Sequence, residues 1–444
     1  MTVPQKICIG FLAVVFVGTI LLMMPFSTAT GTWNDPVVAL FTATSAVCVT
    51  GLAVVDTGTD FSFWGQLCIM LLAQVGGLGY MTFTTFLIML TGRRFDLRHK
   101  IAIQQSLDRR EMQGSGQIIR SIIATTLLFE ITGIFLLLLV FVPDFGWQKG
   151  MWLAIFHSVS AWNNAGFSLF SNSLIDYNSS TLLVLTISGL IIFGGIGYQV
   201  ILEMFFWLRD RLRKIPRHIV LSLDYKVAIS TTIFLLILGT LAFFFVEIKN
   251  TKTLGDLNFR SQLLAALFQS VTTRTAGFNS IDIGGMTTAG LFITIAFMFV
   301  GASPGGTGGG MKTTTLRVLS SCTKSILQGK EQVLLYERRI AVSLILKAVG
   351  VVVGSVTVVI FCTILISLTD PNLDFIQILF EVVSAYATVG LSTGITGNIS
   401  IWGKLILILT MYMGRVGVLL LMSAVLGDPK PSRIHYPEEN LLVG

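Results

Sequence analysis

A short phrase that recurs four times constrains the fold of this chain most strongly. Its copies read SAVCVTGL, SAWNNAGF, VTTRTAGF and SAYATVGL, and each ends in a glycine followed by a large apolar residue. The glycines are Gly51, Gly166, Gly277 and Gly390, so the copies are 115, 111 and 113 residues apart in a chain of 444. Such regular spacing predicts four copies of one structural unit.

Each copy stands in the same place between apolar segments. A long apolar stretch comes first, a short apolar segment leads into the phrase, and a second long stretch follows. The predicted outer helices are 7–26, 118–142, 226–247 and 340–368, and the predicted inner helices are 63–91, 180–208, 287–326 and 402–426. The short segments are 36–47, 150–161, 260–272 and 374–386, with Phe41, Phe156, Leu267 and Phe380 each ten residues before the glycine. We therefore expect the short segments to match in register.

Composition agrees with a membrane protein. The chain is 53% hydrophobic and 12% charged, and its long stretches can cross about 30 Å of hydrocarbon at about 1.5 Å per helical residue. We predict an all-α polytopic membrane protein, in contact with lipid, with eight spans and four re-entrant pore helices around one pore. The expected repeats are residues 1–92, 93–209, 210–327 and 328–444. The first apolar run could also be a signal peptide, but its length and its place in the repeat favour a retained helix.

The position of the basic residues predicts the orientation. The formal charge is +7, and 23 of the 30 Lys and Arg residues fall in the N-terminus, the loops between repeats and the C-terminal tail. The positive-inside rule then places both termini in the cytoplasm. Because the charge reports orientation, we do not expect nucleic-acid binding. The five cysteines form no CxxC pair, so neither a disulfide framework nor a zinc site is indicated.

The phrases themselves point to a monovalent cation. A helix that crosses half of the bilayer leaves backbone polar groups at a depth tolerated only inside protein or beside water. The four segments are therefore expected to converge on an aqueous axis, where their carbonyl ends favour a cation. No carboxylate occurs just before the glycines, which argues against calcium. The predicted filter residues, with potassium as the bound ion, are Val49, Thr50, Gly51, Asn164, Ala165, Gly166, Thr275, Ala276, Gly277, Thr388, Val389 and Gly390.

With these phrases, the sequence resembles the Trk/Ktr/HKT superfamily of potassium transporters, and most closely its KtrB membrane subunits. The resemblance covers nearly the whole chain, because all four outer-helix, pore-helix, filter and inner-helix units can be placed. It implies that the backbone at Gly51, Gly166, Gly277 and Gly390 helps to form one narrow potassium site. Some plant relatives have serine at the first position and select sodium, so the glycine here favours potassium.

The third inner helix is interrupted by the stretch GASPGGTGGGMK at 301–312. Its glycines and proline cannot continue a helix, and Met311 breaks the pattern of a phosphate-binding loop. The resemblance implies that this intramembrane loop is the gate, with Arg415 close to it as a barrier to cations. Pairing of Arg415 with a glutamate is the alternative. The predicted gate residues are Gly305, Gly306, Thr307, Gly308, Gly309, Gly310, Lys312 and Arg415.

Two further features have structural interpretations. The motifs 76–80, 194–198 and 414–417 share a Gly-rich pattern on the inner helices. In the first two repeats we interpret it as close approach of an inner helix to a pore helix. Arg274, three residues before Gly277, could face the outer mouth or turn behind the filter toward Glu381. We favour the second arrangement, since a cation filter would suffer from the first.

We predict potassium uptake, driven by the membrane potential, through a multi-pass protein of a prokaryotic plasma (inner) membrane. The chain is not predicted to be an enzyme and carries no nucleotide-binding motif of its own. The resemblance implies a homodimer with one pore per chain, and a separate cytosolic nucleotide-binding subunit of KtrA type that binds ATP or ADP. That subunit would dock on loops 92–117, 209–225 and 327–340 and on the tail, while 441–444 would contribute to the dimer.

Other functions remain open at this point. A sodium-coupled or sodium-permeable relative, or stimulation by sodium, fits the same phrases. An intramembrane enzyme is the alternative from another class, but HExxH and paired aspartates on facing spans are missing from the sequence. A scaffold without transport would not explain four interior loops.

Overall fold

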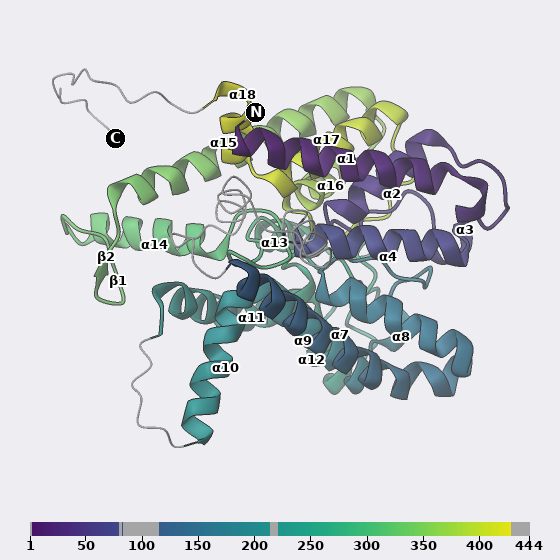
Figure 1. The fold of residues 1–444 in the computed structure, drawn as a ribbon, viewed down its shortest axis with the longest axis horizontal. Helices are drawn as coiled ribbons and strands as arrows, with labels where there is room; N and C mark the ends of the chain where they lie inside the picture. The colour runs from purple at the N-terminus through teal and green to yellow at the C-terminus, as the bar shows by residue number, and fades with distance from the viewer. Residues whose placement is uncertain (1, 80–81, 83–114, 214–220, 428–444) are drawn as a thin grey trace.

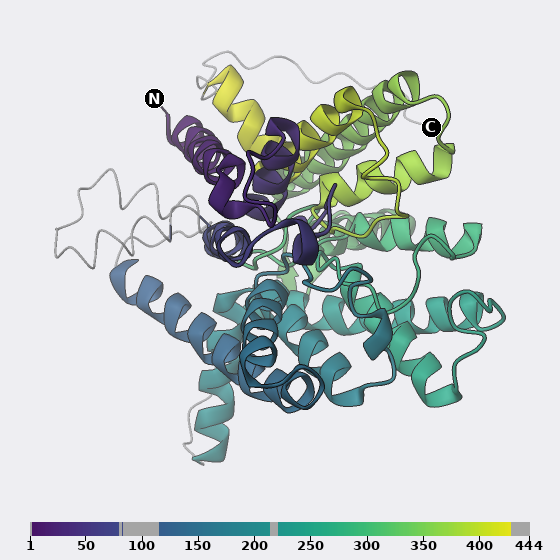
Figure 2. The ribbon, with the colours of Figure 1, turned by 90° about the vertical axis from the view of Figure 1, so that its right-hand side faces the viewer.

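The computed structural model describes residues 2–79, 82, 115–213 and 221–427. The described residues are mostly helical, and the four repeats surround a common centre in chain order. Figure 2 shows this arrangement, with the first repeat in purple at the upper left, the second in blue below it, the third in teal at the lower right and the fourth in yellow-green at the upper right. The predicted all-α repeat architecture is confirmed.

Each repeat begins with a long outer helix that packs against a short helix, as Figure 1 shows for α1 and α2. The outer helices are α1 (Val3–Met23), α7 (Ser115–Phe145), α11 (Leu223–Glu247) and α15 (Val342–Thr369). The short helices are α2 (Pro36–Val47), α8 (Trp147–Trp162), α12 (Phe259–Thr272) and α16 (Phe375–Ala387). Local sequence fixes their starts: Asp35 accepts hydrogen bonds from the amides of Val37 and Val38 at the N-terminus of α2, where Pro36 needs no partner.

The inner helices are α4 (Phe63–Leu78), α9 (Thr181–Ile196) with α10 (Tyr198–Leu212), α13 (Thr288–Met298) with α14 (Thr313–Leu327), and α17 (Ile401–Val416) with α18 (Val418–Leu426). The prediction of continuous helices over 180–208 and 402–426 is wrong. The chain bends by 105° at Gly197 and by 93° at Gly417. Both glycines have a positive φ, of 99° and 86°, a conformation that ends a helix and that side chains with a Cβ avoid.

The other elements are short connections. They are the 3-10 turns η1 (Pro25–Ser27) and η2 (Ile175–Tyr177), helix α3 (Thr57–Asp60), and an antiparallel hairpin of β1 (Leu334–Leu335) and β2 (Arg338–Arg339). In the hairpin Leu334 pairs with Arg339 and Leu335 with Arg338.

Within the described residues, four helices are long and apolar enough to cross a membrane, or six if each bent pair is one span. The sequence predicts eight spans. The difference lies in the first and third repeats. Helix α4 ends at Leu78, where the next residue, Gly79, has a positive φ of 77°, and the rest of the predicted 63–91 helix lies mainly outside the described residues. In the third repeat the 301–312 stretch separates α13 from α14.

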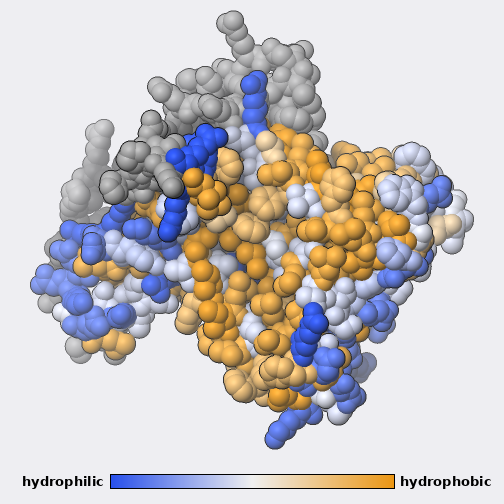
Figure 3. Space-filling view, turned by 90° about the horizontal axis from the view of Figure 1, so that it is seen from below, coloured by the Kyte–Doolittle hydropathy of each residue, from blue (hydrophilic) through white to orange (hydrophobic). Residues whose placement is uncertain are grey.

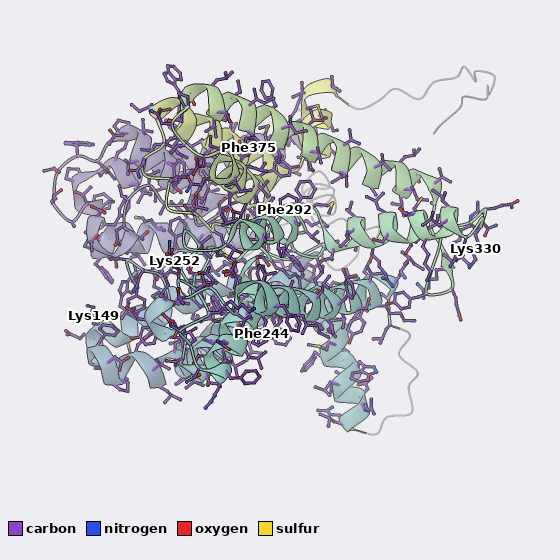
Figure 4. The ribbon with its side chains drawn as sticks, turned by 180° about the vertical axis from the view of Figure 1, so that it is seen from behind. Lys149, Phe244, Lys252, Phe292, Lys330 and Phe375 are labelled. Atoms are coloured by element: carbon purple, nitrogen blue, oxygen red, sulfur yellow. The ribbon has the colours of Figure 1, made fainter. Side chains whose placement is uncertain are left out.

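The surface carries an apolar belt between two polar ends, and Figure 3 shows it in orange between blue regions. Outer helices supply much of it: Leu128 and Phe135 of α7 and Phe234 and Phe245 of α11 are each more than half exposed. Lys149 and Lys330 lie at opposite ends of the molecule (Figure 4). The short helices lie inside, and Phe41, Phe156 and Phe380 are buried.

The third repeat departs from the predicted register. Leu267, the expected counterpart of these phenylalanines, is half-buried, whereas the next residue, Phe268, is fully buried. Hydroxyl contacts show the same offset of one residue: Ser160 Oγ donates to the Phe167 carbonyl at 2.8 Å, and Thr272 Oγ1 to the Phe278 carbonyl at 2.7 Å. Helix α12 is therefore one residue closer to its glycine than its counterparts.

Candidate functional site: a ring of four glycines and the loop beneath it

Gly51, Gly166, Gly277 and Gly390 form a closed ring, called the glycine ring below. A Cβ added to each would strike the carbonyl oxygen of the residue before the next glycine: Ala165 at 2.6 Å from Gly51, Ala276 at 2.8 Å from Gly166, and Val389 at 2.6 Å from Gly277. The fourth contact closes the ring: a Cβ on Gly390 would lie even closer to the Thr50 carbonyl of the first repeat than in the other three cases. All four glycines have φ between 72° and 90°. Only glycine combines this backbone with so close an approach.

The residues two positions before the glycines repeat a second unusual conformation. Val49, Asn164, Thr275 and Thr388 have φ of 58°, 57°, 64° and 51°. Three of them are β-branched, for which the left-handed region is strongly disfavoured. Such backbone is retained only where the surroundings impose it, and it concentrates at functional sites. The four phrases therefore share one strained backbone as well as one sequence pattern.

Side chains of the short helices hold these loops. Ser45 Oγ accepts from the amide of Gly51, and Ser384 Oγ from the amide of Gly390, both at 3.1 Å. In the second and third repeats Ser160 and Thr272 donate instead to the carbonyl after the glycine. Each loop thus has one hydroxyl anchor at its glycine.

A vestibule of about 380 Å³ lies above the glycine ring. All four glycines line it, together with the segments that follow them, including Ser168, Asn279 and Ser392. Asp56 is the charged residue among its lining residues. The carboxylate of Asp56 also accepts from the amides of Gly58 and Thr59 at the start of α3.

The 301–312 loop lies on the other side of the ring and is bonded to several repeats. The amides of Ser303 and Thr307 donate to the carbonyls of Gly195 and Gly194 at 2.9 and 3.1 Å, and the amide of Gly309 donates to Thr388 Oγ1 at 3.0 Å. A Cβ on Gly308 would collide with Thr275 Oγ1. The loop therefore packs directly against the backs of the third and fourth phrases, and its glycines make that fit possible.

Two positively charged side chains, Arg415 and Lys312, contact this loop. Arg415 donates through Nη1 to the Thr307 carbonyl and through Nη2 to the Gly76 carbonyl of α4. Lys312 Nζ donates to the Gly308 carbonyl at 2.7 Å. The alternative in which Arg415 pairs with a glutamate is not found, since Arg209–Asp210 is the ion pair among the described residues. Arg415 thus connects the fourth repeat with the first and the third.

The Gly-rich motifs of the inner helices have two functions. Gly76, Gly194 and Gly414 lie against the carbonyls of Val47, Trp162 and Tyr386 at the ends of the short helices. This confirms the close approach predicted for the first two repeats and extends it to the fourth. The last glycine of the second motif, Gly197, also breaks the helix, and its Cα lies beside the Pro304 carbonyl of the 301–312 loop. The sequence analysis missed this second use, although a third glycine in an apolar run was a signal for it.

Arg274 does not contact Glu381. The Glu381 carboxylate is occupied by Ser392 Oγ, Thr396 Oγ1 and the amide of Thr393. Arg274 is buried, with its Nε unpaired. The favoured interpretation of Arg274 as a brace to Glu381 is therefore wrong, because the loop after Gly390 already satisfies that carboxylate.

The structure brings the predicted residues together in two groups. The twelve phrase residues form and flank the glycine ring, and the seven loop residues and Arg415 lie below it. Groups of three or more His, Cys, Asp or Glu side chains suited to a metal are not found in the described part of the chain. Repeated backbone carbonyls are therefore the oxygen set that this centre offers. The docking segments 92–114, 214–220 and the tail lie outside the described residues.

The chain is similar to known transport proteins over nearly its whole length. The family model described as "TrkH: Cation transport protein" matches residues 5–430. The chain is 38% identical to "Ktr system potassium uptake protein B" of Vibrio alginolyticus, over 99% of this chain and 95% of that protein. It is 36% identical to "Potassium/sodium uptake protein NtpJ" of Enterococcus hirae, over 99% and 97%. The crystal structure of the potassium transporter TrkH from Vibrio parahaemolyticus shares the fold, with a TM-score of 0.71, 18% identity, and coverage of 95% of this chain and 85% of that one.

Proposed function

Because this chain belongs to the TrkH family of cation transport proteins, we propose that it is the ion-conducting subunit of a potassium uptake system. The observation that carries the proposal is the glycine ring, in which four strained loops each place one carbonyl against the glycine of the preceding repeat. A cation that sheds water needs replacement oxygens, and carbonyls held by a rigid frame select by their number and field. The printed names of two relatives, which include potassium uptake, support the choice of ion.

In this proposal potassium enters the vestibule, where Asp56 raises the local cation concentration. It then passes the glycine ring and meets the 301–312 loop. That loop and Arg415 form the gate, because they lie directly beneath the third and fourth phrases and are bonded to them or to their neighbours. The membrane potential supplies about 2.3 kcal/mol per charge per 100 mV.

Control by nucleotide belongs to a separate subunit in this proposal. A cytosolic KtrA-type subunit would bind ATP or ADP and dock on the basic end of the protein, where α14 and the β1–β2 hairpin expose Lys330, Arg338 and Arg339. Two copies of the chain would form a homodimer in a prokaryotic inner membrane, with both termini in the cytoplasm. Rubidium flux that responds to ATP only after the regulatory subunit is added would support this arrangement.

The direct test is uptake of radioactive rubidium by liposomes that contain the purified protein. A membrane potential that is negative inside, generated without valinomycin, should drive rubidium uptake. Excess potassium should compete with rubidium for transport. Expression should also restore growth at low potassium to bacteria without their own uptake systems. Absence of rubidium uptake by correctly folded protein would overturn the proposal. The same liposomes with radioactive sodium test the alternative, since sodium uptake equal to that of rubidium would indicate a sodium-permeable transporter.

A further inference from the structure

Two of the four phrases carry a hydrogen-bonded latch that the other two do not have. In the second repeat His157, nine residues before Gly166, contacts Ser168 Oγ, two residues after it, through Nε2 at 3.0 Å. In the fourth repeat Glu381, nine residues before Gly390, accepts from Ser392 Oγ, two residues after it. The same two positions are therefore connected by different chemistry in the two repeats.

The two serine hydroxyls also make equivalent second hydrogen bonds, to backbone amides of their own loops. Ser168 Oγ accepts from the amide of Phe170 at 3.1 Å, and Ser392 Oγ accepts from the amide of Gly394 at 2.9 Å. Both amides lie four residues after the ring glycine. Each latch thus joins the short helix, the serine and the next turn of the loop in one register.

The direction of the bonds follows from their partners. His157 Nδ1 lies 2.8 Å from the Leu153 carbonyl, which can only accept, so Nδ1 carries the proton in the neutral ring. Nε2 is then the acceptor, and Ser168 donates to it. Ser392 likewise donates to Glu381, because a carboxylate only accepts. In both repeats the serine hydroxyl therefore donates to the helix and accepts from the loop.

The other repeats do not form this contact. The first has Thr42 and Ala53 at the two positions, and alanine has no hydroxyl. In the third, the offset of α12 makes Gln269 the counterpart of His157. Gln269 is fully buried and neither end of its amide has a partner. Asn279, the residue two after Gly277, instead contacts the second repeat through Ser173 Oγ and the amide of Leu174.

The latched repeats face each other across the ring. Gly166 and Gly390 each have Gly51 and Gly277 as neighbours, so they lie on one diagonal. Ser168 and Ser392 line the vestibule just above the ring, while His157 and Glu381 are fully buried behind the loops. A buried polar group is costly to leave unbonded, so these contacts resist displacement of the loops.

We propose that His157 and Glu381 are positioning residues that, through Ser168 and Ser392, fix the outer ends of the second and fourth loops and set the ion selectivity of the ring along that diagonal. The inference rests on the proposed function. A filter distinguishes ions of different size only if its carbonyls resist collapse onto the smaller one. Two latches on one diagonal limit that collapse, whereas the loops of the other diagonal have the hydroxyl anchors but no such latch.

The test measures how strongly sodium inhibits rubidium uptake in liposomes. Ser168→Ala and Ser392→Ala should each lower the sodium concentration for half inhibition by about threefold to tenfold, the usual effect of losing one buried hydrogen bond. Ser168→Thr and Ser392→Thr keep the hydroxyl and should retain the original value. Ser171→Ala, an exposed serine of the same vestibule, and Thr42→Val are the matched controls. The folding of each variant is checked by gel filtration.

A double-mutant cycle separates positioning from general loosening. If Glu381 acts through Ser392, adding Glu381→Gln to Ser392→Ala should change sodium inhibition by less than the sum of the single changes. Normal sodium inhibition in both alanine variants would overturn the inference while rubidium uptake still upheld the proposed function. Failure of the unsubstituted protein to transport rubidium would instead remove the proposed function, and the inference with it.

Discussion

The guanidinium of Arg415 bonds to the carbonyl of Thr307 from a helix 108 residues further along the chain. The same side chain reaches the Gly76 carbonyl of the first repeat. An arginine at membrane depth is expensive to bury, and here backbone oxygens at the interrupted third inner helix satisfy it. The contact fastens the 301–312 loop beneath the glycine ring.

Removal of this contact should release the loop. We expect Arg415→Gln to raise rubidium flux per molecule by about tenfold, because the closed arrangement loses the two hydrogen bonds that the guanidinium donates to backbone carbonyls. Liposome uptake, normalised to reconstituted protein, measures the change. Arg209→Gln removes a charge from the end of α10, where the partner is Asp210, and should leave flux unchanged. Equal flux in Arg415→Gln and the unsubstituted protein would argue against a gate.

Substitutions within the loop should act in the same direction. Gly308→Ala would place a methyl group against Thr275 Oγ1, so the loop must move away from the third phrase. We expect higher flux, and a deletion within 305–310 should have a larger effect of the same sign. Gly189→Ala, in a helix where an added Cβ meets nothing within 4 Å, is the control. A fall in flux without loss of protein would show that the loop supports conduction.

The ring itself predicts a loss of selectivity for Gly51→Ser. A Cβ there would lie 2.6 Å from the Ala165 carbonyl, at a φ of 89° that serine rarely adopts. We expect the loops to separate and rubidium-over-sodium selectivity to fall by about tenfold, as expected when coordinating carbonyls lose their fixed spacing. Competition between the two ions in liposomes reports the ratio, with Gly189→Ser as the matched control. An unchanged ratio would remove this position from the filter.

The vestibule predicts a dependence on ionic strength. Asp56→Asn keeps the helix cap, because asparagine caps as well as aspartate does, but removes the charge. We expect KM for rubidium to rise about twofold to threefold at low salt and to approach the original value at high salt, where screening is stronger. Asp176→Asn, an exposed residue that does not line the vestibule, should have no such effect. A KM difference that persists at high salt would indicate a direct binding role instead.

Sequence alone predicted the architecture well where local signals were strong. Helix α2 spans 36–47 as expected, because Pro36 and Asp35 mark its start and Gly51 marks the turn beyond its end. The breaks at Gly197 and Gly417 were missed, since a glycine inside an apolar run costs only about 1 kcal/mol and does not by itself end a helix. At Gly197 the break coincides with packing against Pro304 of a loop more than a hundred residues away, whereas a Cβ added at Gly417 would meet nothing within 4 Å.

Parts of the centre depend on contacts that no local pattern reveals. Aligning the phrases on their glycines could not detect the one-residue offset of α12, which only burial of Phe268 and the Thr272 bond expose. The pairing of Arg274 with Glu381 failed for a similar reason. A carboxylate in a pore helix attracts any nearby donor, and in the fold the nearest donors are the serine, threonine and amide of its own loop.

The order of the glycine ring has a consequence for biosynthesis. Its last contact joins Gly390 to Thr50, which are at opposite ends of the chain, so a ribosome has made nearly the whole protein before the circle can close. A nascent chain that ends after the third quarter would hold an open arc with unpartnered backbone inside the bilayer. Under the proposed function, ion selectivity can therefore arise only after the fourth repeat has joined the ring.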